Sequence, residues 1–371
     1  MTVTKTHTIR AADALARRLA AAGCRHAFGM PGGEVLTLVD ALETAGITFH
    51  LAKHENAAAF MAEGVYHQTG APGILVATVG PGALNGVNAV ANAHQDRVPM
   101  LVLTGAVDQD EAETYTHQVL DQQAVFRPIT KASFSLVPGA AHVMADKAVG
   151  IATEGRPGPV HIDVPISVAD APVPANAPPP RVDATRCAPA GADLETARSW
   201  LATAERPIMI VGLDAMNENA KGAIKECAET FGVPVITTYK AKGMLPESHS
   251  LSLGGAGLSP LADSHLLPLV AEADLILCVG YDPIEMRVGW RDVWSPASQR
   301  VIDITAVANS HYMHQSSLNI IADCSASLKA ICEGIPPRNT WQNDAPAKTK
   351  TALTTAFPTD DTWGPSAVID V

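Results

Sequence analysis

The stretch KHENAAAFMAEGVYHQTG, residues 53–70, follows an apolar run, ITFHLA (47–52), that has the composition of a buried strand. The alanine-rich sequence after Glu55 has the periodicity of an amphipathic helix. A strand that ends where a helix begins is typical of an α/β fold, in which ligands bind beyond the carboxyl ends of the strands. Glu55 lies at this point. Taken alone, an acid in the first helical turn is more simply explained by the helix dipole, so a structural role stays open beside a functional one.

Strands and helices alternate on both sides of this stretch. In the first half of the chain, further apolar runs of strand length are RHAFGM (25–30), GILVATVG (73–80), PMLVLTG (99–105) and VHIDVP (160–165). In the second half they are PIMIVGL (207–213), VPVITT (233–238), ADLILCVG (273–280) and RVIDIT (300–305). Short apolar strands separated by helices predict parallel, doubly wound sheets.

Composition divides this pattern into domains. Residues 171–190 are rich in Pro and Ala and have no periodicity, which is typical of a surface linker. We therefore predict an α/β protein with two doubly wound parallel-sheet domains, at 1–170 and 191–335, the second of them Rossmann-like. Residues 336–371 are predicted to be a tail.

Charge and cysteine usage exclude several classes of protein. The formal net charge of −12 argues against nucleic acid as a partner, because phosphate binding requires a basic surface. The 6 cysteines form no CxxC pair and indicate reduced thiols in a cytoplasmic protein. The N-terminus has no signal-peptide pattern, and no apolar run reaches the roughly 18 residues of a membrane helix.

Two glycine-rich turns follow expected strands in the first domain. GMPGGE (29–34) and GPGALN (80–85) each join a strand end to a helix start, where the backbone can approach a ligand closely. GMPGGE is not a phosphate loop, because no Lys followed by Ser or Thr comes after the glycines. A plain strand–turn–helix connection explains either turn equally well.

Two other polar segments have a simple structural explanation. HQVLDQQ (117–123) has no strong periodicity, and although His117 or Gln118 could reach a site, a solvated loop is the simpler reading. His311 and His314 form an HxxH pair without a third ligand at a suitable spacing, and we interpret them as ordinary polar residues. No metal site is predicted within the chain.

Together these segments resemble one family. FGMPGGEVL, KHENAAAFMAEGVYHQTGAPG, TVGPGALN, PMLVLTGAV, HQVLD, PITK and GRPGPVHIDVP occur in the order and spacing of thiamine diphosphate (ThDP) enzymes of the acetolactate synthase and pyruvate oxidase type. The resemblance covers about residues 1–335, which correspond to the pyrimidine-binding and central domains of that family. The combination of the helix that begins with His-Glu and the GPGxxN turn makes the resemblance specific.

The resemblance implies a chemical role for Glu55. In the family a glutamate at this position hydrogen-bonds N1′ of the aminopyrimidine ring, which favours the tautomer whose 4′-imine takes the C2 proton of the thiazolium. An apolar setting lets the carboxyl group share a proton at neutral pH. The same resemblance implies that Gln118, and with it His117, faces the substrate.

It also implies a set of residues that surround the cofactor. Gly32 and Gly33 correspond to residues that line the channel above the thiazolium ring. The pyrimidine pocket is expected to be shaped by Gly80, Pro81, Gly82 and Asn85.

The chain departs from the family pattern around the expected substrate pocket. His117 and Val119 replace an aromatic and an acidic residue on either side of Gln118, and Glu34 replaces a small residue. Asp108 replaces a frequent proline, and Ile166 replaces a lysine of the substrate channel. These changes argue against pyruvate as the substrate.

The central domain of the family binds FAD or ADP in some members and nothing in others. VGLDAMN (211–217) lacks the glycine run of flavin binders, so we expect neither nucleotide here.

The GDG motif that holds Mg²⁺ and the diphosphate in this family does not occur in the sequence. The segment DDTWGPSAVIDV (360–371) resembles the first helix of the domain that carries it. The expected arrangement is a split enzyme in which a second chain supplies the GDG domain and Mg²⁺, shares the ThDP, and forms a hetero-oligomer with paired copies of this chain. A regulatory or scaffold subunit, a truncated form of a longer enzyme and a binding module built on the central domain are the alternatives. The expected reaction is 2-keto acid decarboxylation, or C–C carboligation or cleavage.

Overall fold

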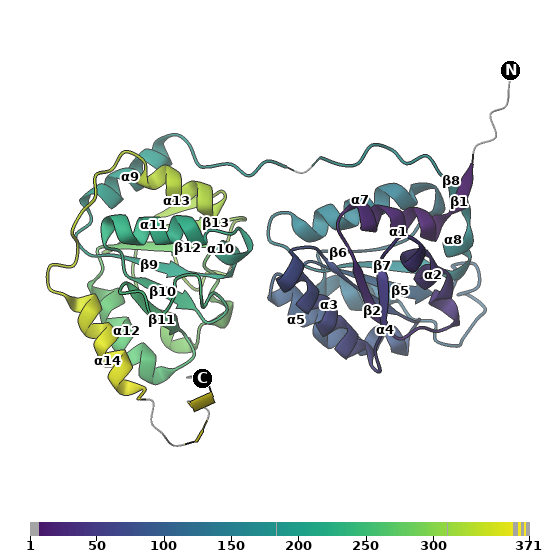
Figure 1. The fold of residues 1–371 in the computed structure, drawn as a ribbon, viewed down its shortest axis with the longest axis horizontal. Coiled ribbons are helices and arrows are strands. Elements are labelled where there is room, and N and C mark those ends of the chain that lie inside the picture. The colour runs from purple at the N-terminus through teal and green to yellow at the C-terminus, as the bar shows by residue number, and fades with distance from the viewer. Residues whose placement is uncertain (1–6, 183, 310, 359–362, 365–366, 369–371) are drawn as a thin grey trace. The chain divides into compact units, whose positions relative to one another are not determined.

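The computed structural model describes residues 7–182, 184–309, 311–358, 363–364 and 367–368. The chain divides into two compact units, Met1–Ala184 and Thr185–Val371. Each unit has a parallel sheet with helices on both of its faces (Figure 1). The predicted fold class, α/β with two doubly wound parallel sheets, is therefore confirmed.

The sheet of the first unit has the strand order β3-β2-β4-β5-β7-β6, and all neighbouring strands are parallel. Its strands are β2 (His26–Gly29), β3 (Thr48–Leu51), β4 (Gly73–Ala77), β5 (Met100–Ala106), β6 (Ala132–Ser135) and β7 (Val160–Pro165). The central strand β4 is buried along its whole length, which explains why its sequence is apolar on both faces. Strand β7 is also buried throughout but carries the polar residues His161 and Asp163.

Helices of the first unit bury their small apolar residues on opposite faces of this sheet. The helices are α1 (Ala11–Ala21), α2 (Leu36–Thr44), α3 (Glu55–Thr69), α4 (Pro81–Asn85), α5 (Val87–Gln95), α6 (Gln122–Phe126), α7 (Ala141–Thr153) and α8 (Ile166–Asp170). Apolar residues of α1, α2 and α7 pack on one face, and those of α3 and α5 pack on the other. The chain therefore changes face between β2 and β4, which is the topological switch point where open α/β sheets bind ligands.

The second unit repeats this architecture with the strand order β11-β10-β9-β12-β13-β14. Its strands are β9 (Pro207–Val211), β10 (Val235–Thr238), β11 (Ser252–Ala256), β12 (Leu275–Val279), β13 (Arg300–Thr305) and β14 (Leu318–Ile321). Its helices are α9 (Ala192–Thr203), α10 (Leu213–Asn217), α11 (Lys221–Phe231), α12 (Pro260–Glu272), α13 (Cys324–Cys332) and α14 (Ala345–Ala356). One face is covered by α9, α11 and α13, and the other by α12 with two buried tryptophans, Trp290 and Trp341.

The segments expected to be linker and tail contain regular structure. Within the expected linker, Pro172–Pro174 forms β8, which pairs antiparallel with β1 (Thr8–Arg10). In the expected tail, α14 packs against α12, and buried Trp341 donates a hydrogen bond from Nε1 to Pro207 O at 2.7 Å. Residues 336–356 thus contribute to the second unit, because an indole ring supplies a large apolar surface as well as one directional hydrogen bond. Most of residues 360–371, the segment that resembles the first helix of a further domain, lies outside the described residues.

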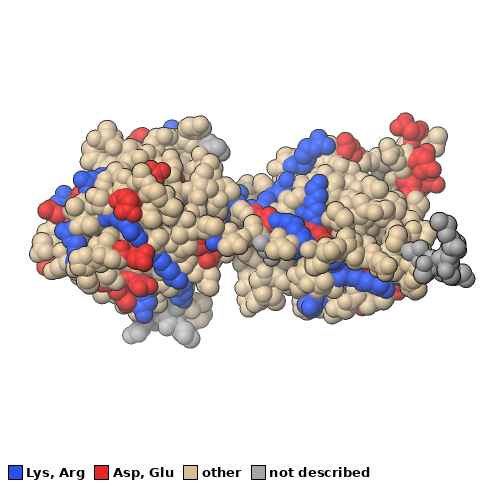
Figure 2. Space-filling model, turned by 90° about the horizontal axis from the view of Figure 1, so that it is seen from above, with Lys and Arg blue, Asp and Glu red and all other residues tan. Residues whose placement is uncertain are grey.

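Two observations concern membrane-spanning segments and the charge of the surface. In the part of the chain that the structure describes, no helix combines the length and apolar character needed to cross a bilayer. On the face seen in Figure 2, Lys and Arg side chains lie among Asp and Glu side chains.

Candidate active site

Glu55 is the first residue of α3 and directly follows the short turn after β3. The preceding residue, His54, caps the helix by accepting a hydrogen bond on Nδ1 from Asn56 N at 3.1 Å. The Glu55 side chain is only 4% exposed, between buried Ala52 and the buried alanines of the helix. A carboxyl group in such surroundings requires a polar partner, because burial without one is costly.

The GPG turn after β4 supplies that partner. Asn85, at the end of α4, donates from Nδ2 to Glu55 Oε2 at 3.0 Å. Gly82 faces the other carboxyl oxygen, since a Cβ atom added there would lie 3.3 Å from Glu55 Oε1. Pro81 begins the helix, where its missing N–H costs nothing. The pocket residues predicted around Glu55 therefore meet there, although their roles toward a cofactor stay predictions.

Thr78 joins this turn to the first glycine-rich loop. A Cβ atom at Gly82 would lie closer than 3.0 Å to Thr78 Oγ1, and one at Gly32 would lie 2.6 Å from Thr78 Cγ2. Thr78 is thus wedged between two glycines that come from loops on opposite sides of the switch point. Gly33 differs, because an added Cβ would meet nothing within 4 Å.

The segment around Gln118 lies against the same turn. Gly80 has a positive φ of 62°, and a Cβ there would lie 3.0 Å from Gln118 O and 3.1 Å from Gln118 Cβ. Gln118 itself has φ 60°, a left-handed conformation that is uncommon outside glycine. His117 is exposed and its ring lies edge-on to Tyr115 at 6.3 Å. In the described residues the structure brings Gln118, but not His117, to the GPG turn.

Sequence reasoning missed a buried polar network behind this turn. Gln122 is 2% exposed; its Oε1 accepts from Gly80 N at 2.6 Å, and its Nε2 donates to Asp163 Oδ1 at 2.6 Å. Thr104 Oγ1 also donates to Asp163 Oδ1 at 2.8 Å, and His161 Nε2 contacts Thr104 Oγ1 at 2.8 Å. The network connects β5 and β7 to the backbone of the GPG turn.

Electrostatics within this network favour a charged Asp163. Burial opposes its ionisation, but the interaction with His161 and the hydrogen bonds from Thr104 and Gln122 outweigh burial, so the pKa of Asp163 is held below its ordinary value. A signal for this network was present in the sequence. His161 and Asp163 are polar residues two positions apart in a strand that is otherwise apolar.

Asp108 and Ile166, two residues that depart from the family pattern, lie in segments that contact each other. Asp108 accepts hydrogen bonds from Ser167 Oγ at 2.7 Å and from Ser167 N at 3.2 Å. The neighbouring Ile166 side chain is exposed. Among the described residues, no group of three or more His, Cys, Asp or Glu side chains is placed to hold a metal ion.

Comparison with known proteins identifies both units. Residues 9–125 match the family profile described as thiamine pyrophosphate enzyme, N-terminal TPP binding domain. Residues 194–331 match the profile of the central domain of the same enzymes. Thiamine pyrophosphate is another name for ThDP.

Curated relatives match across both units. The chain is 34% identical over 352 residues to a probable acetolactate synthase large subunit of Methanocaldococcus jannaschii, with 90% of this chain and 58% of that protein covered. It is 32% identical to the acetolactate synthase isozyme 1 large subunit of Escherichia coli K12, covering 86% of this chain and 57% of that protein. The chain thus spans somewhat more than half the length of these relatives. It belongs to the acetolactate synthase-like family of thiamine diphosphate-dependent enzymes.

Proposed function

We propose that this chain is a subunit of a ThDP-dependent enzyme that decarboxylates a 2-keto acid or forms or cleaves an adjacent C–C bond, with Glu55 as the residue that activates the cofactor. When bound, ThDP supplies a nucleophilic carbon and a sink for the electron pair released on C–C cleavage. The observation that carries the proposal is the buried Glu55 carboxyl group at the switch-point edge of the sheet, in a chain that belongs to this family.

The residues around Glu55 fit a planar, nitrogen-containing ring. Asn85 holds one carboxyl oxygen by a hydrogen bond from its side-chain amide, which orients the other oxygen. Gly82 lies next to that other oxygen, and its lack of a side chain leaves room for Thr78. Glu55 would thus hold or transfer a proton at N1′ of the pyrimidine ring. Gly32, Gly33, Gly80 and Pro81 would border the same cofactor.

The substrate side is proposed to involve Gln118 and His117. Gln118 is supported by its close approach to Gly80 and its left-handed backbone, since strained backbone often occurs at functional sites. His117 is supported only by its place next to Gln118. The hydrogen bonds from Ser167 to Asp108 tie together two segments in which this chain departs from the family pattern. A 2-keto acid other than pyruvate fits these departures better.

We further propose that a second chain supplies the GDG domain, the diphosphate site and Mg²⁺, in a hetero-oligomer with paired copies of this chain. Exposed apolar side chains on β3, α3 and α4 support a covering partner: Leu51 (73% exposed), Phe60, Met61 and Leu84. Exposed apolar groups that adjoin one site are typical of surfaces that another protein covers. We place the complex in the cytoplasm.

The central domain is proposed to bind neither FAD nor ADP. Gly212, the glycine of the VGLDAMN turn, is packed against Gly280, since an added Cβ would lie closer than 3.0 Å to Gly280 O. Protein backbone thus occupies the space next to this glycine, and no run of glycines follows it.

Glu63 offers a matched control for the role of Glu55. It lies two turns further along α3, is 8% exposed, and accepts from Asn92 Nδ2 at 3.1 Å, so both residues are buried glutamates paired with an asparagine amide. Glu55→Gln should lower the decarboxylation rate of the complex by about 10²–10⁴-fold, the range of general acid–base catalysis. Glu63→Gln should change it little. Equal activity in the two variants would refute the role of Glu55.

The partner is tested by native mass spectrometry of the protein purified from its own cells. A co-purifying chain together with ThDP and Mg²⁺ would support the split enzyme. A homo-oligomer of this chain that carries neither would refute it and favour a regulatory subunit or a form derived from a longer enzyme.

A further inference from the structure

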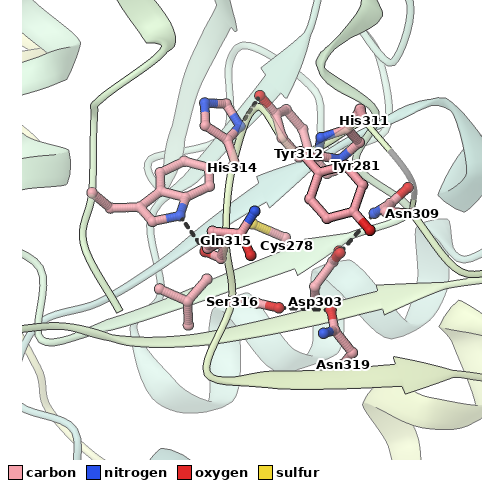
Figure 3. Close-up of a pocket in the computed structure, with 12 residues that line it drawn as sticks. Cys278, Tyr281, Asp303, Asn309, His311, Tyr312, His314, Gln315, Ser316 and Asn319 are labelled. Atoms are coloured by element: carbon pink, nitrogen blue, oxygen red, sulfur yellow. Dashed lines mark hydrogen bonds between the residues drawn. The ribbon is translucent and has the colours of Figure 1, made fainter. Parts of the chain in front are cut away.

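The second unit contains a polar pocket that the proposed reaction does not use. It lies over one face of the sheet, where Cys278 on β12, Asp303 on β13 and Asn319 on β14 are direct neighbours across the strands. The pocket has a volume of about 260 Å³. Tyr281, from the connection between β12 and β13, and residues of the connection between β13 and β14 line it (Figure 3). The latter are Asn309, His311, Tyr312, His314, Gln315 and Ser316. Trp294, from the same connection as Tyr281, also lines the pocket.

Asp303 is the acidic side chain among the residues that line this pocket. Asp303 lies on its floor next to Asn309, whose Nδ2 donates to Asp303 Oδ2 at 2.7 Å (Figure 3). None of the lining residues, all of which the structure describes, is Lys or Arg. Burial and then the nearby Asp303 raise the pKa of the Cys278 thiol, which therefore stays neutral. The lining therefore offers an anion no Lys or Arg side chain.

The imidazole of His314 adds no positive charge. Its Nε2 lies 2.5 Å from Trp290 O, so that nitrogen carries the proton, and its Nδ1 accepts from Tyr281 Oη at 3.1 Å. Burial lowers the pKa of His314 below its ordinary value, which is consistent with this neutral tautomer. The sequence reading of His314 as an ordinary polar residue missed its place in the wall of a pocket.

Aromatic rings form the wall around this histidine. The ring of His314 lies 4.3 Å from that of Trp294 and is stacked on Tyr281 with a centroid distance of 5.6 Å. Trp294 is held in place by a hydrogen bond from Nε1 to Gln315 O at 2.9 Å. Tyr and Trp rings attract cations through their π electrons, and this attraction grows as water is excluded.

We propose that this pocket binds a small organic ammonium ion. The ammonium group would pair with the carboxylate of Asp303, and its carbon atoms would lie against the rings of Tyr281 and Trp294. The volume of about 260 Å³ is many times the roughly 10–15 Å³ that one water molecule needs by the same measure, so the pocket has room for a simple amine. The site is independent of Glu55, so either proposal can fail alone.

The test is isothermal titration of the full chain with benzylamine and with choline, and with ADP and inorganic phosphate as anionic controls. We expect saturable binding of at least one amine, with a dissociation constant in the millimolar range or tighter, and none of the anions. Asp303→Asn should weaken amine binding by about tenfold or more, because a charge-assisted contact is lost. Asp193→Asn, an equal charge change at an exposed residue of α9, should leave it unchanged.

A second variant keeps the test valid if Asp303→Asn does not fold. Asn319 is exposed, neighbours Asp303 and accepts from Ser316 Oγ at 2.6 Å, a contact that a carboxylate also accepts. Asn319→Asp should therefore fold and tighten amine binding several-fold. Absence of amine binding in the unmodified chain, unchanged binding in both variants, or binding of ADP in place of amines would overturn the proposal.

Discussion

Gly82→Ala should couple strongly to Thr78, because the new methyl group would occupy the space of the Thr78 hydroxyl. An added Cβ lies closer than 3.0 Å to Thr78 Oγ1, and the Thr78 Cγ2 atom lies close to the backbone of Gly32 on its other side. Overpacking of this kind costs about 1–3 kcal/mol. Alanine also has a higher helix propensity than glycine in α4 by about 1 kcal/mol, which partly hides the cost in the single variant.

A double-mutant cycle with Thr78→Ala separates these effects. The propensity gain is the same in both backgrounds and cancels, whereas the collision exists only when Thr78 is present. In Thr78→Ala the nearest remaining atoms, Cβ of residue 78 and Glu55 Oε1, would lie 3.3 Å from the new methyl group, which small shifts accommodate. The expected coupling free energy is therefore about 1–3 kcal/mol.

Native-state hydrogen exchange of β4 and α4 amides in the full chain measures this coupling without requiring both units to unfold together. Gly33→Ala is the matched control, because its Cβ would meet nothing within 4 Å. We expect this control to change the free energy of unfolding by less than about 0.5 kcal/mol. A coupling below that value, or a Gly33→Ala cost equal to that of Gly82→Ala, would refute the packing argument.

Three further predictions test other parts of the chain. Gln122→Ala leaves the buried N–H of Gly80 without its acceptor, so exchange at Gly80 should accelerate and the free energy of unfolding should fall by about 1–3 kcal/mol; unchanged exchange would contradict this. Burial lowers the pKa of Lys131 from its ordinary 10.5 to about 8, so between these values the unfolded chain binds a proton that the folded chain has released. Stability should therefore rise with pH across this window, as measured by urea denaturation, and Lys131→Met should remove that rise. Trp341→Phe should destabilise the second unit by about 1–3 kcal/mol, because Pro207 O loses its hydrogen bond. An unchanged hydrogen-exchange rate in β9 would show that the Trp341 hydrogen bond does not stabilise this unit.

Periodicity alone predicted most of the fold. Apolar runs such as GILVATVG and ADLILCVG form central strands because only a strand buried on both faces requires uninterrupted apolar residues. The short edge strands β11 and β14 escaped notice, since half-buried residues with turns around them have no distinctive pattern. Trp341 and α14 were also missed, because a tail that packs on a finished domain needs few apolar residues.

For the site, local sequence and tertiary structure contributed differently. Glu55, Gly82 and Asn85 could be named from the sequence, since a strand end, a glycine turn and a helix start are local features with local signals. Asp163 has a local signal, as a polar residue in an otherwise apolar strand, but its partner Gln122 could not be named, because their hydrogen bond joins residues 41 positions apart only after α6 has packed against β7. The pocket over Asp303 has the same origin. The sequence by itself thus determined the class of fold and the residues at its strand ends, whereas only the tertiary structure decided which polar side chains meet, because their partners come from neighbouring strands rather than neighbouring positions.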